Sequence, residues 1–360
     1  MTSVANNEFS IDGKQISQSS PCYFIADIAA NHDGDLSRAK DLIYLAKEAG
    51  ADAAKFQHFK ANTIVSDHGF KSLGSQQSHQ TKWKKSVFDV YKAASVSTEW
   101  TETLKETCDD AEISFFTSAY DFDLVDHIDD FVNAYKIGSG DITWIEMVEK
   151  IASKNKPYII ATGASTIEDV ERAVNAGLII NQNLALLQCN TNYTGSLENM
   201  KYIQLNVLNA FRLKYPSMIL GLSDHTPGHA TVLGAITLGA KIVEKHFTDN
   251  ISRVGPDHAF SMDPVTWKDM VDRSRELEAS LGHDKKNIED NEIETVVIQR
   301  RSIRATSDLV AGTVLKKEDT IPLRPCPEGA LPPYEIDNIL GKKLKRNVSE
   351  GDHFFAHDFE

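Results

Sequence analysis

Short apolar runs alternate regularly with longer amphipathic segments along most of this chain. The short runs predict eight β-strands, at Tyr23–Ala29, Asp52–Phe59, Ile113–Ser118, Ala134–Gly138, Tyr158–Thr162, Ala185–Cys189, Met218–Leu222 and Lys241–Phe247. Strands that alternate with helices indicate a parallel sheet with helical crossovers. Eight such units predict an α/β fold of the (β/α)8 TIM barrel type.

Two of the segments between these runs carry clear helix signals. In Leu36–Ala49, apolar residues recur close to every 3.6 positions. The segment Ser165–Ala176 begins Ser-Thr-Ile-Glu, which is the pattern of a capping box. Gly50 and Gly177 follow the two segments, where glycine commonly ends a helix. We therefore expect a helix in each segment.

A doubly wound open sheet is the alternative α/β fold. Such a sheet often carries a G-x-G-x-x-G turn after its first strand, and no such motif follows Tyr23–Ala29. The polar, poorly periodic segment Thr63–Trp100 follows the second strand. On a barrel this insertion would lie at the C-terminal face, where active-site loops belong.

The pattern changes near residue 283. A charged segment begins there, and short β-like pieces follow it around the proline-rich sequence RPCPEGALPP. We therefore predict a barrel domain at 1–282, a linker at 283–294 and a small β-rich domain at 295–360. A domain this short has little core of its own, so we expect it to depend on another surface.

Composition narrows the class of protein. The net charge of −14 disfavours a nucleic acid or an anionic membrane surface as the partner. Four scattered cysteines indicate reduced thiols rather than a disulfide framework. The N-terminal sequence lacks the pattern of a signal peptide, and no apolar run approaches the roughly 20 residues of a membrane span. We expect a cytoplasmic protein.

Polar residues follow each predicted strand. Parallel barrel strands bring their C-terminal ends to one mouth, where the active sites of this fold lie. In chain order, the strand-end residues are Asp27, Lys55, Gln57, Thr117, Ser118, Lys136, Ser139, Thr162, Cys189, Asn190, Ser223, Asp224, His225, Glu244, Lys245 and His246. Because side chains alternate along a strand, Lys55 shares a face with Gln57, and Glu244 with His246. The sequence therefore predicts one polar site at the mouth.

Two histidines on neighbouring strands suggest a metal centre. His225 and His246 could meet, since adjacent strands lie about 4.8 Å apart. Neutral imidazoles suit a divalent ion such as Mn²⁺, Zn²⁺, Fe²⁺ or Co²⁺, which could polarise a carbonyl group. Two separate histidines with structural hydrogen bonds are the alternative. His229 follows in the start of a helix, where a structural or capping role is expected.

Three lysines near strand ends could bind anions. Lys55, Lys136 and Lys245 could hold a phosphate and a carboxylate together with serine hydroxyls and backbone N–H groups. Lysines at a barrel rim with solvated ammonium groups are the alternative. A lysine could also form a Schiff base with a carbonyl substrate.

With these residues in place, the chain resembles the sialic acid synthase family. The resemblance runs from about residue 20 to the end. The motifs that carry it are FIADIAANHDGD, EAGADAAKFQHF, AYKIGSGD, ATGAST, GLSDHT and EKHFTDNISRVGPDHAFSMDP, with RPCPEG in the tail. It implies a (β/α)8 barrel and a C-terminal antifreeze-like domain that is exchanged across a homodimer. It also implies that phosphoenolpyruvate condenses with an N-acetylmannosamine-type sugar and releases phosphate.

The resemblance also implies roles for individual residues. His225 and His246 would bind the divalent metal, Mn²⁺ first and Mg²⁺ or Co²⁺ as alternatives, and would be catalytic with Asp27 and Asp141. Phosphoenolpyruvate would contact Lys55, Ser118, Lys136, Ser139 and Ser223. The sugar would contact Gln57, Thr191, Tyr193 and Asp257, and Arg324 of the partner subunit's tail would reach its N-acyl group.

The chain departs from the family pattern at several of these positions. Asp27 and Asp141 stand where family members usually carry Glu, so the carboxylates are one methylene shorter. The motif after the sixth strand and the tail motif Arg324-Pro325-Cys326 also differ from their usual forms. These changes lie where the sugar should bind. A 2,4-diacetamido-trideoxy hexose is therefore an alternative acceptor to N-acetylmannosamine or its 6-phosphate.

Two other functions fit parts of the sequence. A lysine-dependent pyruvate aldolase on the same barrel would use Lys136 as its imine former, but this leaves the two histidines unexplained. A non-enzymatic binding module would use the tail to recognise a carbohydrate or ice surface. Convergent polar strand ends over the first 280 residues favour the synthase over both.

Overall fold

The computed structural model describes residues 4–73, 80 and 83–360 of this chain. These residues form two compact units, Met1–Gly282 and His283–Glu360. No helix in the described part of the chain is long and apolar enough to cross a membrane.

The first unit confirms the predicted TIM-type barrel. Within the described residues, eight parallel strands close in the order β10-β3-β4-β5-β6-β7-β8-β9. Each predicted strand is present within a few residues of its expected ends. The strands are β3 (Tyr23–Asp27), β4 (Ala53–His58), β5 (Ser114–Ala119), β6 (Tyr135–Ile137), β7 (Tyr158–Ala161), β8 (Leu184–Cys189), β9 (Ile219–Asp224) and β10 (Ile242–His246).

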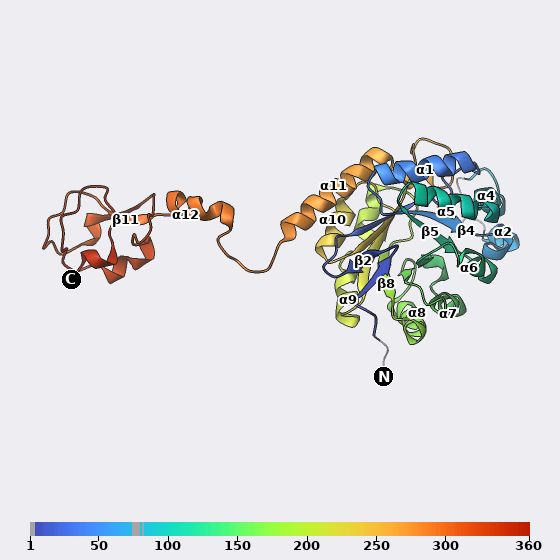
Figure 1. Ribbon diagram of the computed structural model, residues 1–360, viewed down its shortest axis with the longest axis horizontal. Coiled ribbons are helices and arrows are strands. Elements are labelled where there is room, and N and C mark those ends of the chain that lie inside the picture. The colour runs from blue at the N-terminus through green and yellow to red at the C-terminus, as the bar shows by residue number, and fades with distance from the viewer. Residues whose placement is uncertain (1–3, 74–79, 81–82) are drawn as a thin grey trace. The chain divides into compact units, whose positions relative to one another are not determined.

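Helices surround the barrel strands (Figure 1). They pack through the apolar face that each turns towards the sheet, as α1 does through Ala39, Leu42, Ile43 and Ala46. The helices of this unit are α1 (Leu36–Glu48), α2 (Ala61–Ile64), α3 (Asp67–Ser72), α4 (Val87–Ala94), α5 (Thr101–Asp110), α6 (Phe122–Ile128), α7 (Ile145–Ala152), α8 (Ile167–Ile180), α9 (Val207–Lys214), α10 (Ala230–Thr237) and α11 (Pro264–Leu281), with the short 3₁₀ turns η2 (Thr98–Trp100), η3 (Ser139–Asp141), η4 (Leu197–Tyr202) and η5 (His258–Phe260).

The expected insertion Thr63–Trp100 lies after β4 and holds the end of α2 together with α3, α4 and η2. Residues 74–79 and 81–82 of this insertion lie outside the described residues. The segment is therefore more helical than its weak periodicity indicated.

The signals at the two helix ends gave different results. Gly50 lies just beyond α1 with a φ of 91°, as expected of a glycine that ends a helix. The second prediction was wrong in two ways. The capping box joins Thr166 to Asp169 rather than Ser165 to Glu168. Gly177 lies inside α8 and does not end it. The position needs a glycine because a Cβ there would come within 2.3 Å of the hydroxyl oxygen of Tyr158.

An N-terminal hairpin that the sequence analysis did not predict fills the lower part of the barrel. It consists of β1 (Glu8–Ile11) and β2 (Lys14–Ser17). Its apolar residues Phe9, Ile11 and Ile16 belong to one buried cluster with residues at the starts of the barrel strands, such as Ile242. This cluster closes the end of the barrel opposite to the strand ends that carry the polar residues.

The second unit is small and has little regular structure. Its core is a separate apolar cluster that includes Ile303, Leu315 and Phe354. Isolated β-bridges and 3₁₀ turns account for much of it. Its elements are η6 (Asp290–Glu292), α12 (Ile293–Gln299), β11 (Ser302–Ala305), η7 (Lys317–Asp319), β12 (Thr320–Leu323), η8 (Pro333–Asn338) and η9 (Ala356–Asp358).

Candidate active site

Strand register brings the polar strand ends to one level of the barrel. Asp27 on β3 pairs with His246 on β10 and with Lys55 on β4. Ser223 on β9 pairs with Glu244 on β10. Because hydrogen-bonded neighbours in a parallel sheet point to the same face, these side chains meet inside the mouth.

Asp27 is the centre of the first group of contacts. Its Oδ2 accepts hydrogen bonds from Lys55 Nζ at 2.5 Å and from Gln57 Nε2 at 3.0 Å. The Nε2 of His246 lies 3.8 Å from the same oxygen. Burial alone would lower the pKa of Lys55, but the carboxylates of Asp27 and Glu244 outweigh it and raise that pKa. Lys55 is therefore a buried, charged ammonium group.

A second group forms across the barrel. Lys136 Nζ lies 3.2 Å from Glu244 Oε1, which also accepts a hydrogen bond from Ser223 Oγ at 3.3 Å. The other carboxylate oxygen of Glu244 and the hydroxyl of Ser118 are buried without a hydrogen-bond partner among the described residues. Buried polar atoms without partners are costly, so these atoms indicate a place where a polar ligand binds.

The two histidines meet as the sequence analysis expected. The ring centroids of His225 and His246 are 5.4 Å apart. His225 Nδ1 lies 3.0 Å from the carbonyl oxygen of Asn190, which fixes its ring. Burial, reinforced by His225, holds the pKa of His246 well below its usual range. The Nδ1 of His246 is buried and has no partner within the described part of the chain.

These features fit a divalent metal. The hydrogen bond to Asn190 orients the ring of His225, as backbone carbonyls orient metal-binding histidines. His246 is held neutral, which is the form that coordinates metals. The described residues contain no group of three or more His, Cys, Asp or Glu side chains arranged for a metal ion.

Two aromatic side chains enclose the imidazoles. The ring of Tyr193 lies 4.4 Å from His225, and that of Phe260 lies 4.8 Å from His246, centroid to centroid. Tyr193 was predicted from the sequence to lie in the site, whereas Phe260 was not. Phe260 belongs to η5, in the long connection after β10, and only its position within the motif EKHFTDNISRVGPDHAFSMDP could have indicated it.

The loop after β7 packs closely against Ser139 and Thr191. The backbone N–H of Gly163 donates to Ser139 Oγ at 2.9 Å. A Cβ at Gly163 would come within 1.8 Å of Thr191 Oγ1 and 3.0 Å of Cys189 Sγ. Burial would raise the pKa of Cys189, but His225 outweighs it, so that the thiol pKa is lowered and the imidazole pKa of His225 is raised.

Two further carboxylates lie near the mouth. Burial raises the pKa of Asp141 to about 6 and that of Asp257 also to about 6. Asp257 Oδ2 accepts a hydrogen bond from the N–H of Ala30 at 3.1 Å, which ties the connection after β10 to the end of β3. Both groups can therefore change charge near neutral pH.

Three residues lie apart from these groups. Lys245 turns to the other face of β10, where its Nζ donates to Asp224 at 2.5 Å and to the carbonyl oxygen of Thr226 at 2.6 Å. This lysine therefore does not line the mouth. His229 pairs with Asp269 at 3.0 Å. Arg324 is exposed in the second unit.

Comparison with known proteins gives a consistent result over nearly the whole chain. The model of the NeuB family matches residues 42–286, and that of the SAF domain matches residues 300–360. N,N'-diacetyllegionaminic acid synthase from Legionella pneumophila is 38% identical over 92% of this chain and 92% of its own length. N-acetylneuraminate-9-phosphate synthase from Homo sapiens is 30% identical over 94% of this chain and 93% of its own length.

A solved structure agrees with the fold. The N-acetylneuraminic acid (sialic acid) synthetase from Leptospira borgpetersenii superposes with a TM-score of 0.69 and is 25% identical. The match covers 81% of this chain and 96% of the solved one.

Proposed function

The chain belongs to the NeuB family, which includes synthases of legionaminic, pseudaminic and sialic acids, and we propose that it condenses phosphoenolpyruvate with a 2-acetamido or 2,4-diacetamido hexose. The C3 carbon of phosphoenolpyruvate forms a bond to the aldehyde carbon of the open-chain sugar. Water adds at C2 as phosphate leaves, which gives a nine-carbon 2-keto acid.

One observation carries this proposal. In a chain of net charge −14, two buried ammonium groups, on Lys55 and Lys136, lie at the mouth among hydroxyl groups and beside the two imidazoles. Both ammonium groups are paired with carboxylates, but the buried hydroxyl of Ser118, whose residue lies beside Lys136 in the sheet, has no partner among the described residues and so indicates a polar ligand here. We infer that Lys55, Lys136, Ser118, Ser139 and Ser223 bind the phosphate and carboxylate of phosphoenolpyruvate.

The acceptor sugar would lie on the other side of the imidazoles. Gln57, Thr191, Tyr193 and Asp257 would contact its hydroxyl and acylamino groups. Asp27 and Asp141 would donate and accept protons during the reaction. The pKa of Asp141, which is raised to about 6, suits a group that gains or loses a proton near neutral pH. The aromatic rings of Tyr193 and Phe260, which pack against the imidazoles, would keep water away from them.

A divalent ion fits at His225 and His246, with Mn²⁺ as the first choice and Mg²⁺ or Co²⁺ as alternatives. When bound, such an ion supplies Lewis-acid polarisation of the sugar aldehyde. The chain's own part is to hold the imidazoles in place: Asn190 fixes His225, and burial keeps His246 neutral.

The second unit would complete the site in a homodimer. We propose that Arg324 of one subunit reaches the N-acyl group of the sugar in the partner subunit's barrel. A guanidinium group donates well to carbonyl and hydroxyl oxygens. The four free cysteines support a cytoplasmic location, where thiols stay reduced.

The lysine aldolase alternative fits the geometry less well. Lys136 is held against Glu244, and the pKa of Lys55 is raised by Asp27 and Glu244 despite burial. Imine formation needs a neutral amine with a lowered pKa. An ion-paired ammonium group does not provide it.

The test measures phosphate release from phosphoenolpyruvate with a panel of 2-acetamido hexoses. We expect a chelator to abolish release and Mn²⁺ to restore it, with a product whose mass is that of the sugar plus a pyruvate unit. Borohydride should trap no adduct. Activity that ignores the chelator, together with an enzyme adduct trapped by borohydride, would favour the aldolase instead.

A further inference from the structure

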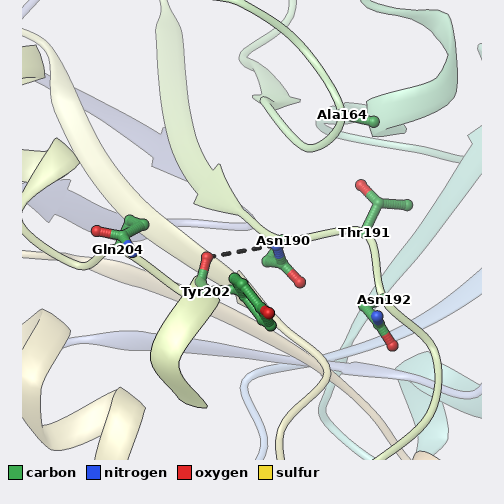
Figure 2. A pocket seen from close by; sticks show the side chains of 6 residues that line it. All are labelled: Ala164, Asn190, Thr191, Asn192, Tyr202 and Gln204. Atoms are coloured by element: carbon green, nitrogen blue, oxygen red, sulfur yellow. Dashed lines mark hydrogen bonds between the residues drawn. The ribbon is translucent and has the colours of Figure 1, made fainter. Parts of the chain in front are cut away.

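The residues around the two imidazoles are supported in different ways. On one side, Asn190 directly follows β8 and lines a pocket of about 340 Å³ (Figure 2). Its Nδ2 donates to the carbonyl oxygen of Tyr202 at 3.3 Å, a bond drawn in Figure 2. On the other side, Asp257 and Phe260 lie well beyond the end of β10, in the connection 247–263. Residues on so long a connection need contacts of their own to stay in place.

A cluster of ion pairs ties this connection to the loop after β3. At its centre, Asp33 Oδ1 lies 2.9 Å from His258 Nε2, and Asp33 Oδ2 accepts from Arg253 Nε at 3.0 Å and from Arg253 Nη2 at 2.9 Å. Arg38 Nε lies 3.2 Å from the same Oδ2. The Nη1 and Nη2 of Arg38 donate to the two carboxylate oxygens of Asp249 at 2.7 and 2.6 Å, a bidentate pair of fixed geometry. We call these five residues the Asp33 cluster.

His258 is the most deeply buried member of the Asp33 cluster, with no exposed surface. Its Nδ1 lies 2.7 Å from Thr248 Oγ1, while its Nε2 faces Asp33. A carboxylate only accepts hydrogen bonds, so Nε2 carries a hydrogen. A Cβ at Gly255 would come within 2.5 Å of His258 Cδ2, so the backbone of the connection packs directly against the ring. The ring is therefore held on three sides.

His258 lies between the two site residues of the connection. Asp257 precedes it, and the Oδ2 of Asp257 accepts from the N–H of Ala30 at 3.1 Å. Phe260 follows in the same 3₁₀ turn, η5, and its ring lies 4.8 Å from that of His246, centroid to centroid. Because one turn carries all three residues, a displacement of His258 would move both Asp257 and Phe260.

The residues assigned to phosphoenolpyruvate are supported differently. Lys55, Ser118 and Lys136 belong to β4, β5 and β6, and each of these strands pairs with a neighbour on both sides. Their positions therefore do not depend on the connection 247–263. A weakened Asp33 cluster should disturb the acceptor sugar and spare phosphoenolpyruvate.

We propose that Asp33 and His258 are positioning residues for the acceptor sugar. Their hydrogen bond holds Asp257 and Phe260 at the imidazoles, and they act through these two residues rather than on the substrate. This inference rests on the proposed synthase function and adds two residues to it.

The first test replaces Asp33. Asp33→Asn keeps the shape of the side chain but turns one acceptor oxygen into a donor, which cannot satisfy both His258 and Arg253. With the 2-acetamido hexose that the parent converts best, KM for the sugar should rise about tenfold, the effect of losing one hydrogen bond to a charged group. KM for phosphoenolpyruvate should stay within about twofold of the parent. Gly255→Ala, which crowds the His258 ring without a change of charge, should give the same pattern.

Two comparisons separate positioning from a general loss of stability. Asp35→Asn makes the same charge change two residues away and should leave both KM values unchanged. Asp35 caps α1 by accepting from the N–H groups of Ser37 and Arg38, which asparagine also does. His258→Gln keeps an N–H donor for Asp33 and should have a lower KM for the sugar than His258→Leu, which has none. KM values for the two substrates that rise equally, or a His258→Gln protein no better than His258→Leu, would overturn the inference.

Hydrogen exchange separates this inference from the proposed function, because it needs no substrate. In the whole protein, Asp33→Asn should speed amide exchange in residues 248–262 by about tenfold and leave β6 unchanged. If the parent condenses no acceptor, the synthase function fails, while faster exchange confined to 248–262 would still support the role of the Asp33 cluster in holding the connection. Unchanged exchange there would reject it.

Discussion

At the scale of single residues, the candidate site is a set of buried charged side chains that form ion pairs with one another. Alternation along the strands was enough to predict that Lys55, Gln57, Glu244 and His246 face the mouth. It could not predict that Lys136 pairs with Glu244, because contacts across a barrel depend on how its strands tilt and stagger. Phe260 was not predicted for a similar reason, because it contacts His246 from the long connection after β10 rather than from a strand. The roles of these residues stay predictions.

Replacing His225 tests the metal centre at this scale. His225 follows the end of β9, and its Nδ1 lies 3.0 Å from the carbonyl oxygen of Asn190 at the mouth of the barrel. His225→Ala should therefore lose metal binding and at least about 100-fold in activity, while its melting temperature changes by only a few degrees. Metal content, measured after dialysis with Mn²⁺, checks the first point and circular dichroism the second.

His229→Ala is the matched control, since His229 pairs with Asp269 away from the mouth and should keep both metal and activity. An unfolded His225→Ala protein, or one that still binds metal in full, would make His225 a structural residue.

Asp141 makes stability depend on pH. Its pKa is raised to about 6 in the folded protein, so the folded state binds more protons than the unfolded state between about pH 4 and 6, and stability falls as pH rises through that window. The amide introduced by Asp141→Asn cannot ionise. The advantage of Asp141→Asn over the parent should grow by about 2 kcal/mol from pH 4 to pH 8, allowing for partial exposure.

Urea unfolding at the two pH values measures this difference. A stability offset between Asp141→Asn and the parent that is the same at both pH values would show that Asp141 is not perturbed by burial.

At the scale of elements, the sequence predicted the strands better than the ends of the helices. A buried strand is a short, uninterrupted apolar run, and such a run can be recognised from a few consecutive residues. The role of Gly177 could not be predicted in this way, because glycine is required there by the hydroxyl group of Tyr158 on a neighbouring strand. The hairpin Glu8–Ser17 was missed because two four-residue strands give little pattern.

The loop after β7 offers a prediction at this scale. Gly163→Ala should cut activity by more than about tenfold, because the new Cβ would displace Thr191 and Ser139 from the mouth. Gly140→Ala is the control, since a Cβ there meets no atom within 4 Å. Kinetic constants for both substrates would be measured for each variant. Equal activity of the two variants would show that the loop is free to move away.

At the scale of the whole molecule, the proposed exchange of tails makes each active site depend on two subunits. Mixing His225→Ala with Arg324→Ala under conditions of subunit exchange should restore up to about a quarter of wild-type activity, since about half of the dimers are mixed and one of their two sites is whole. Phosphate release measures the recovery. No recovery, with exchange verified by differently tagged subunits, would mean that each tail serves its own barrel.

The existence of the C-terminal unit could be predicted from the sequence, but the pairing of its residues could not. Its turns, prolines and short apolar pieces indicated a small separate module, and the structure has a second compact unit from His283 onward. Its bridges pair residues far apart in its sequence, such as Leu309 with Val348, and local patterns do not encode such pairs.

The hairpin that fills the lower barrel has a consequence for how the protein is made. Phe9, Ile11 and Ile16 are translated before the eight barrel strands, yet the cluster that buries them includes Ile242 on the last of these strands. At about 5–20 residues per second, the nascent chain holds these apolar side chains uncovered for roughly ten to fifty seconds. A chaperone that binds the emerging β1–β2 hairpin segment would protect them until β10 is translated. Synthesis that stalls before β10 would leave an open sheet prone to aggregation.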